Sequence, residues 1–140
     1  MKNLTIQFDP DPSAAARETI KLGVDLHNVA ATGQSDNYAV AFTLKDENGE
    51  VRGGLLGDIW GGWLHIGFLW VDRPLRGNAW ATQLITAAES YARERGAHHA
   101  TLETFSFQAR PLYEKLGYEV FGTLDDFPPG HAKFFLRKAL

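Results

Sequence analysis

The sequence predicts an α/β (α+β) fold, with a mixed, mostly antiparallel sheet of about seven strands flanked by about four helices. Three observations lead to this prediction. Strand-like and helix-like periodicities alternate along the chain, its 140 residues suit one domain, and 44% hydrophobic with 22% charged residues is an ordinary globular composition. We therefore expect residues 1–140 to form a single domain.

The first two predicted elements are a strand and a helix. Apolar and polar side chains alternate over residues 4–8, and the Asp-Pro-Asp-Pro run that follows ends the strand because proline cannot continue a ladder. Ser13 is a candidate N-cap. Apolar residues at helical spacing then predict a helix over 14–31, either continuous or broken near Gly23.

Three antiparallel strands are predicted next, as a meander over 38–44, 51–60 and 63–71. The Asn48-Gly49 pair between the first two suits a tight turn, since both residue types tolerate positive φ. The pair Gly53-Gly54 inside the second strand suggests a β-bulge.

Helices and strands alternate over the second half of the chain. The expected elements are a helix from Ala79 to near Gly96, a strand over 100–105, a helix over 108–116, and strands over 118–123 and 133–136. A helical crossover follows strand 63–71 and another follows strand 100–105, so local parallel pairing is permitted at both places. The last strand is expected to pair antiparallel with its neighbour.

Charge and composition exclude several classes of function. A net charge of −3 argues against binding to nucleic acid, which needs clustered Lys and Arg. No apolar stretch approaches the roughly 20 residues that span a bilayer, and the first residues lack the apolar region of a secretory signal, so we expect a cytoplasmic protein without a membrane partner. The sequence has no Cys, which excludes disulfides, zinc–thiolate sites and a cysteine nucleophile.

The junction between strand 63–71 and the following helix is the segment richest in candidate function. Small residues at a helix start let main-chain N–H groups approach an anion such as a pyrophosphate. A plain strand–helix turn with a solvated Arg76 explains the same residues. Neither a Gly-Lys-Ser/Thr phosphate loop nor the Gly-x-Gly-x-x-Gly dinucleotide motif is present.

Two motifs resemble those of the GNAT superfamily of N-acetyltransferases. The run Arg76-Gly77-Asn78-Ala79-Trp80-Ala81 is similar to the family's Arg/Gln-x-x-Gly-x-Gly/Ala motif, and residues 106–118, Ser-Phe-Gln-Ala-Arg-Pro-Leu-Tyr-Glu-Lys-Leu-Gly-Tyr, are similar to its Asn-x-x-Ala-x-x-x-Tyr-x-x-x-Gly-Phe/Tyr helix. The resemblance implies a GNAT fold with acetyl-CoA as the acyl donor. It assigns cofactor binding to Leu69, Val71, Arg76, Gly77, Asn78, Ala79, Trp80, Ala81 and Ser106.

The chain departs from these motifs at two positions. Ala79 stands where the first motif usually has Gly, and its methyl group is expected to be tolerated because a helical φ is assumed there. Ser106 stands where the second motif usually has Asn. These departures motivate an alternative function, a catalytically silent acyl-CoA-binding domain that acts as a sensor or interaction module.

The predicted catalytic residues are Tyr113 and Glu103. The resemblance assigns Tyr113 the role of proton donor to the departing thiolate, although a scaffold role for its ring is the other interpretation. A general base must border the cleft, and Glu103 on a short central strand is the first candidate, with His65 as the second. The resemblance also places Asn28 in the acceptor site, and we predict that His65 binds the acceptor there as well.

The predicted function is therefore direct transfer of the acetyl group of acetyl-CoA to a primary amine, since no Cys can carry a covalent intermediate. The acceptor is a small-molecule amine or a protein amine, and the sequence does not choose between them. No metal site is predicted. A homodimer is an open expectation, because members of the resembled family often dimerise.

Overall fold

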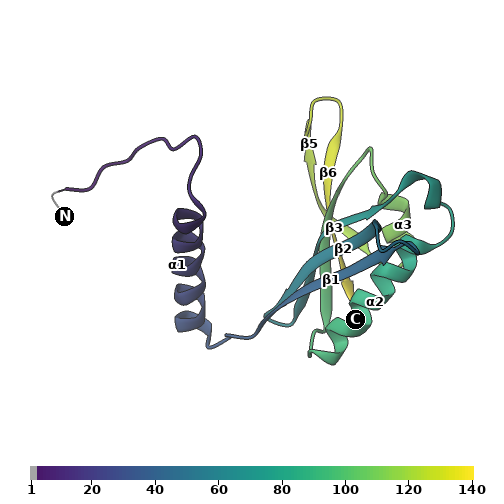
Figure 1. The fold of residues 1–140 in the computed structure, drawn as a ribbon, viewed down its shortest axis with the longest axis horizontal. Coiled ribbons are helices and arrows are strands. Elements are labelled where there is room, and N and C mark those ends of the chain that lie inside the picture. Colours follow the sequence, from purple (N-terminus) through teal and green to yellow (C-terminus); the bar gives the residue numbers. More distant parts are fainter. Residues whose placement is uncertain (1–2) are drawn as a thin grey trace. The chain divides into compact units, whose positions relative to one another are not determined.

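The computed structural model describes residues 3–140, which form two compact units, an N-terminal one that reaches Ser35 and a C-terminal one from Asp36 to Leu140 (Figure 1). The N-terminal unit contains one helix, α1 (Ala14–Thr32). The predicted cap is confirmed, since the Ser13 hydroxyl accepts a hydrogen bond from the Ala16 N–H at 3.1 Å. The helix continues unbroken through Gly23.

The strand predicted over residues 4–8 is wrong. These residues have no regular secondary structure, and the alternating side chains Leu4, Ile6 and Phe8 are all exposed. Alternation supplies the side-chain pattern of a strand, but a strand also needs a neighbour to hydrogen-bond its backbone. The described part of the N-terminal unit contains no strand that could serve as this neighbour.

The C-terminal unit is built on a mixed sheet of six strands in the order β1-β2-β3-β4-β6-β5 (Figure 1). Its elements are β1 (Asn37–Lys45), β2 (Val51–Trp60), β3 (Trp63–Val71), a 3₁₀ turn (Arg73–Leu75), α2 (Trp80–Glu94), β4 (His99–Phe105), α3 (Arg110–Lys115), β5 (Glu119–Asp125) and β6 (Ala132–Ala139). The described residues thus hold six strands and three α-helices where about seven and four were predicted. None of these helices is long and apolar enough to cross a membrane.

Of the two places where parallel pairing is permitted, the sheet uses one. β3 and β4 pair parallel, joined by the crossover helix α2. β4 and β5 are not neighbours, because β6 lies between them and pairs antiparallel with both. After the hairpin from β5, the strand β6 therefore pairs with the edge of β4 at which β5 would have had to pair parallel.

The predicted meander is confirmed, but the bulge predicted at Gly53-Gly54 is wrong. Gly53 and Gly54 are in register with both neighbouring strands, and the register of β2 shifts at Arg52, opposite the Leu44/Lys45 step of β1, and again at Leu56/Gly57 against β3. Gly53 and Gly54 are required for a different reason. A side chain at either position would lie only 2.8 Å from a carbonyl oxygen of a neighbouring strand.

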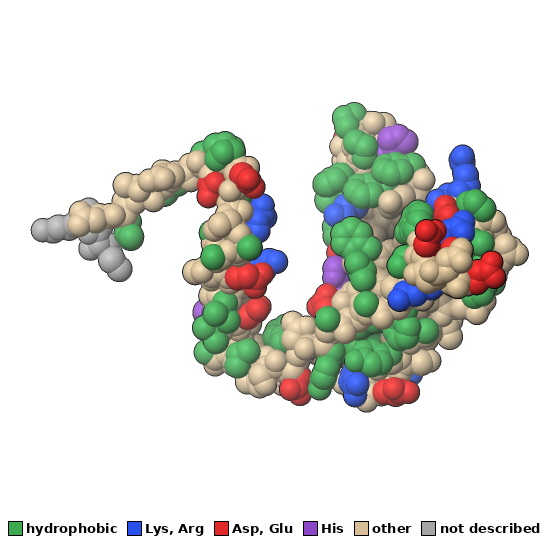
Figure 2. All heavy atoms as spheres, viewed as in Figure 1, with side chains coloured by type: hydrophobic (Ala, Val, Ile, Leu, Met, Phe, Trp, Pro, Cys, Tyr) green, Lys and Arg blue, Asp and Glu red, His purple; other side chains and the backbone are tan. Residues whose placement is uncertain are grey.

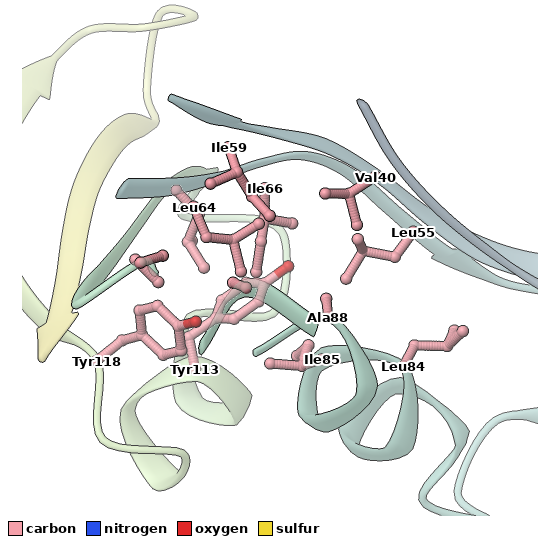
Figure 3. Packing of buried hydrophobic residues seen from close by; sticks show 14 of the residues in the cluster. Val40, Leu55, Ile59, Leu64, Ile66, Leu84, Ile85, Ala88, Tyr113 and Tyr118 are labelled. Atoms are coloured by element: carbon pink, nitrogen blue, oxygen red, sulfur yellow. The ribbon is translucent and has the colours of Figure 1, made fainter. Parts of the chain in front are cut away.

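The core lies between the sheet and α2, which packs against β1, β2 and β3. Figure 3 shows sheet residues such as Leu55 and Leu64 facing Ile85 and Ala88 of the helix, with Tyr113 and Tyr118 beside them. Leu55, Leu64 and Ile85 are fully buried. The apolar faces predicted by period-2 and period-3.6 spacing meet here, which fixes α2 against the sheet.

A buried ion pair lies beside this core. The Glu89 carboxylate, only 5% exposed, accepts hydrogen bonds from the Lys138 ammonium at 2.9 and 3.0 Å and from the Tyr118 hydroxyl at 2.8 Å. Burial, followed by the negative charge of Glu89, raises the pKa of Tyr118 far above its usual range. The cluster ties α2 to β6 and fixes Tyr118, whose ring makes an edge contact with Tyr113.

Candidate active site

The pocket of the C-terminal unit opens where β3 and β4 separate. The two strands pair only from Trp63 to Ile66 on β3, opposite His99 to Leu102 on β4. Beyond Ile66 an extra residue, Gly67, enters β3 opposite the Leu56/Gly57 step of β2. Such a bulge bends its strand, so β3 leaves β4 and a cavity of about 570 Å³ opens between them.

The bulge explains why position 57 is glycine. A side chain there would collide with the carbonyl oxygen of His65 on β3. The sequence reading missed this signal because a glycine inside a strand does not say which neighbour comes close. Gly57 therefore supports the shape of the pocket without lining it.

Six of the predicted site residues line the pocket, and they come from β3, the following loop, α2, β4 and α3. They are Leu69, Val71, Arg76, Ala81, Glu103 and Tyr113. Residues that sequence reasoning did not single out also line it, among them Phe68, Phe107 and Leu112. Their apolar character gave no signal beyond core packing.

The loop between β3 and α2 is a candidate anion cradle. Gly77 has φ +84°, and no atom lies within 4 Å of the place where its side chain would begin. The loop is braced by Arg76, whose Nε donates to the Val71 carbonyl at 2.9 Å, and by Asn78, whose amide donates to the Leu75 carbonyl at 3.2 Å. Gly77, Asn78 and Trp80 thus lie in or next to this loop without lining the cavity itself.

The expectation that Ala79 has a helical φ is wrong. Ala79 is the N-cap of α2 with φ +63°, in the left-handed region. A Cβ in this region is strained by about 1 kcal/mol relative to glycine. A glycine would adopt this cap conformation without strain. The helix α2 begins at Trp80, with its first-turn N–H groups directed out of its end.

Glu103 and His65 form a hydrogen-bonded pair across β4 and β3. The distance from the Glu103 Oε2 to the His65 Nε2 is 2.8 Å. On the far side of the ring, the Asp58 Oδ1 of β2 lies 3.6 Å from Nδ1. The three side chains are a third to a half exposed, and Glu103 is the member that lines the pocket. The two candidate bases of the sequence reading are thus one connected group.

Tyr113 is buried, with 7% of its surface exposed, and it lines the pocket from α3. Burial raises the pKa of its hydroxyl above the usual value, so the phenol stays protonated at neutral pH. Within residues 3–140 no side chain or backbone group hydrogen-bonds this hydroxyl. A protonated phenol without a protein partner suits a proton donor to a bound molecule.

Two predicted site residues lie elsewhere. The Ser106 hydroxyl accepts from the Ala132 N–H at 3.0 Å and lies 3.3 Å from the His131 Nδ1, so it holds the start of β6. Asn28 belongs to α1 in the N-terminal unit. Gln108, two residues after Ser106, lines the pocket, and its side-chain oxygen accepts from the Phe105 N–H at 2.9 Å.

No group of three or more His, Cys, Asp or Glu side chains in the described part of the chain is arranged to hold a metal ion. The polar side chains that line the pocket include the carboxylate of Glu103, the phenol of Tyr113 and the guanidinium of Arg76, beside the neutral Thr104 and Gln108. The first three are groups that move protons and bind anions.

Comparison with known proteins gives the family. The model of the acetyltransferase (GNAT) family matches residues 8–118, which include the pocket loop, Glu103 and Tyr113.

The chain belongs to the GNAT family of acetyltransferases.

Individual relatives agree with this GNAT assignment. The blasticidin-S acetyltransferase of Streptomyces morookaense is 41% identical over 95 residues, which cover 67% of this chain and 70% of the relative. The 1.9 Å crystal structure of a Bacillus cereus acetyltransferase is 33% identical and superposes with a TM-score of 0.82 over 96% of this chain and 98% of its own.

A more distant GNAT structure contains the donor. A Bacillus anthracis protein described as a streptothricin acetyltransferase, in complex with acetyl coenzyme A, is 18% identical and superposes with a TM-score of 0.64 over 73% of this chain and 62% of its own. At this identity the likeness is one of fold.

Proposed function

We propose that this GNAT protein transfers the acetyl group of acetyl-CoA directly to a primary amine of a small molecule. One observation carries the proposal: the cavity between the separated strands β3 and β4 is bordered by the Gly77 loop and is lined by both Glu103 and Tyr113. An anion cradle, a base and an acid thus border one space.

The residues present fit a coenzyme A thioester. Beyond Ile66 the edge of β3 that faces β4 has no strand partner among the described residues, so its backbone is free to pair with the amides of a pantetheine arm. The open space at Gly77, the first-turn N–H groups of α2 and Arg76 form a site for a pyrophosphate. When bound, the thioester supplies the acetyl group.

In the proposed mechanism Glu103 accepts the proton that the acceptor's ammonium must lose before it can attack. Its Oε2 is held by His65 at 2.8 Å, which leaves Oε1 to face the pocket. His65 therefore orients the base, with Asp58 beside the second ring nitrogen. The same acidic group favours a positively charged acceptor near Glu103.

Tyr113 is the proposed proton donor to the leaving thiolate. Its ring is buried, its hydroxyl is protonated at neutral pH, and no described residue hydrogen-bonds that hydroxyl. The remaining contacts of the ring, such as the edge contact with Tyr118 at 6.1 Å between centroids, fix its place. A proton donor held in this way needs no rearrangement before it acts.

The relatives support a small-molecule acceptor over a protein amine. The relative with 41% identity is named for blasticidin S. We include in the proposal that residues 1–140 act as one acetyltransferase domain, supported by a family match that begins in the N-terminal unit and runs through most of the C-terminal one. The cytoplasmic location and the homodimer stay predictions.

The test is a thiol-release assay with acetyl-CoA across a library of primary amines, preceded by thermal unfolding with coenzyme A. At a hundredfold excess over its dissociation constant a ligand adds about 2.7 kcal/mol to the free energy of unfolding, so an unchanged melting temperature contradicts the proposal. Binding without turnover of any amine favours the silent-domain alternative.

A glycine pair supplies a matched control for the cradle. Gly77 and Gly49 both have positive φ, +84° and +79°, and both have open space where a side chain would begin. Replacement of either by Val strains the backbone equally, but only Gly77→Val is expected to weaken coenzyme A binding. Equal affinity in the two variants would place the pyrophosphate elsewhere.

A further inference from the structure

Lys133, at the start of β6, is a cation enclosed by aromatic rings. Its Nζ lies 5.7, 5.2 and 5.3 Å from the ring centres of Phe105, Phe127 and Phe135. Figure 2 shows apolar side chains gathered over this β5–β6 end of the C-terminal unit. No carboxylate of residues 3–140 lies within ion-pair distance of Lys133, whereas most other partly buried cations of the sheet have one.

Lys133 lies close to the proposed base. In the antiparallel pair of β4 and β6, Glu103 lies opposite Phe135, and Phe105 lies opposite Lys133. Directly opposite residues share a face of the sheet, so Lys133 is the diagonal neighbour of Glu103, with Cα atoms about 7–8 Å apart. Glu103 nevertheless pairs with His65, and the Lys133 ammonium is left for another anion.

The rings connect Lys133 to the pocket. Phe105 stacks on Phe107 at 5.3 Å with an angle of 9° between the planes. Phe107 is 56% exposed and lines the pocket together with Glu103. The exposed Phe107 ring, with the half-buried Phe105 ring stacked on it, thus links the pocket that Glu103 lines to the Lys133 ammonium.

We propose that the acceptor is a zwitterion, whose amine meets Glu103 and whose carboxylate binds Lys133, with a flat ring between them resting on Phe107. This inference deepens the proposed function and depends on it. A carboxylate at Lys133 gains a charge-assisted hydrogen bond from an ammonium that the surrounding rings have partly removed from water. The contact is formed outside the reacting atoms, so it selects the acceptor and leaves the donor site unchanged.

The probes are para-(aminomethyl)benzoate and its methyl ester, which share the amine and the ring and differ in the carboxylate. The wild-type protein is expected to acetylate the acid with a kcat/KM about 10- to 100-fold above that of the ester, the range of one hydrogen bond to a charged group. Lys133→Met keeps the aliphatic chain among the rings and is expected to abolish this preference, with the ester rate and the KM for acetyl-CoA unchanged.

Lys45→Met is the matched control, because Lys45 is an exposed lysine at the end of β1 and is expected to keep the full preference for the acid. The comparison of acid and ester in the wild-type protein needs no variant, so a Lys133→Met protein that fails to fold does not remove the test. A preference that survives Lys133→Met, equal rates on acid and ester, or a raised KM for acetyl-CoA overturns the inference. Inactivity on both probes overturns it too, while coenzyme A binding still upholds the proposed function.

Discussion

The pair of Glu103 and His65 allows the proposed base to be tested against a structural role. Glu103→Gln keeps the size of the side chain and removes its basicity. General base catalysis contributes about 10²–10⁴-fold, so kcat is expected to fall in this range, which is a rise of about 3–5 kcal/mol in the barrier. His65→Gln leaves the carboxylate without its 2.8 Å partner and is expected to lower kcat by a smaller factor.

The same variants are expected to change stability little. The His65 and Glu103 side chains are 41% and 33% exposed, and ion pairs at exposed sites contribute only about 0.2–1 kcal/mol to folding. The free energy of unfolding should therefore stay within about 1 kcal/mol of the wild-type value. A rise in the activation barrier that is much larger than the change in the free energy of unfolding therefore indicates a catalytic role for the pair and not a structural one.

The assay is a double-mutant cycle on kcat, measured by thiol release at saturating acetyl-CoA, with urea unfolding of each protein. If His65 acts through Glu103, the double variant loses no more than Glu103→Gln alone. Glu119→Gln is the control, because Glu119 pairs with Arg137 at 3.1 Å and does not line the pocket.

Two results would refute this reasoning. A kcat for Glu103→Gln within twofold of the wild-type value shows that the proton leaves by another route. Losses that add in the double variant show that His65 acts independently of Glu103, which agrees with its predicted place in the acceptor site.

Three further predictions concern the acid, the cap and the alkaline limit. Tyr113→Phe is expected to lower kcat by about 10²–10⁴-fold with little change in melting temperature, because no described residue bonds its hydroxyl; a loss of stability without loss of kcat would mean that the ring is only scaffold. Ala79→Gly is expected to leave the free energy of unfolding unchanged or raise it by up to about 1 kcal/mol, since relief of the left-handed Cβ offsets the added freedom of the unfolded chain; chemical denaturation measures this, and a loss above that size contradicts the strain. The pKa values of Tyr113 and Tyr118 are raised in the folded protein, so above their ordinary value of 10.0 the unfolded state loses protons that the folded state keeps. Stability should fall as pH rises through that value, by up to about 1.4 kcal/mol per pH unit per group, and a melting temperature that is flat from pH 9 to 11 would contradict it.

Local chemistry determined much of the fold in advance. The hairpin of β1 and β2 followed from alternation and from Gly49, whose φ of +79° lies in the turn, and the start of α1 followed from the Ser13 cap. These features depend on residues close in sequence, because turn conformations and caps are settled within a few residues. The two motifs around Gly77 and Tyr113 could be recognised in the sequence for the same reason, since each is a run of neighbouring residues.

What only the tertiary structure decided depends on residues far apart in sequence. The alternation at residues 4–8 was read as a strand, but strands exist through their neighbours, and the position of β6 between β4 and β5 is likewise a matter of pairing. The contact of His65 with Glu103 and that of Lys133 with the Phe105 ring arise from register across the sheet. A sequence states which side chains a strand presents on each face, and only the assembled sheet decides which of them meet, because each register brings a different set within bonding distance.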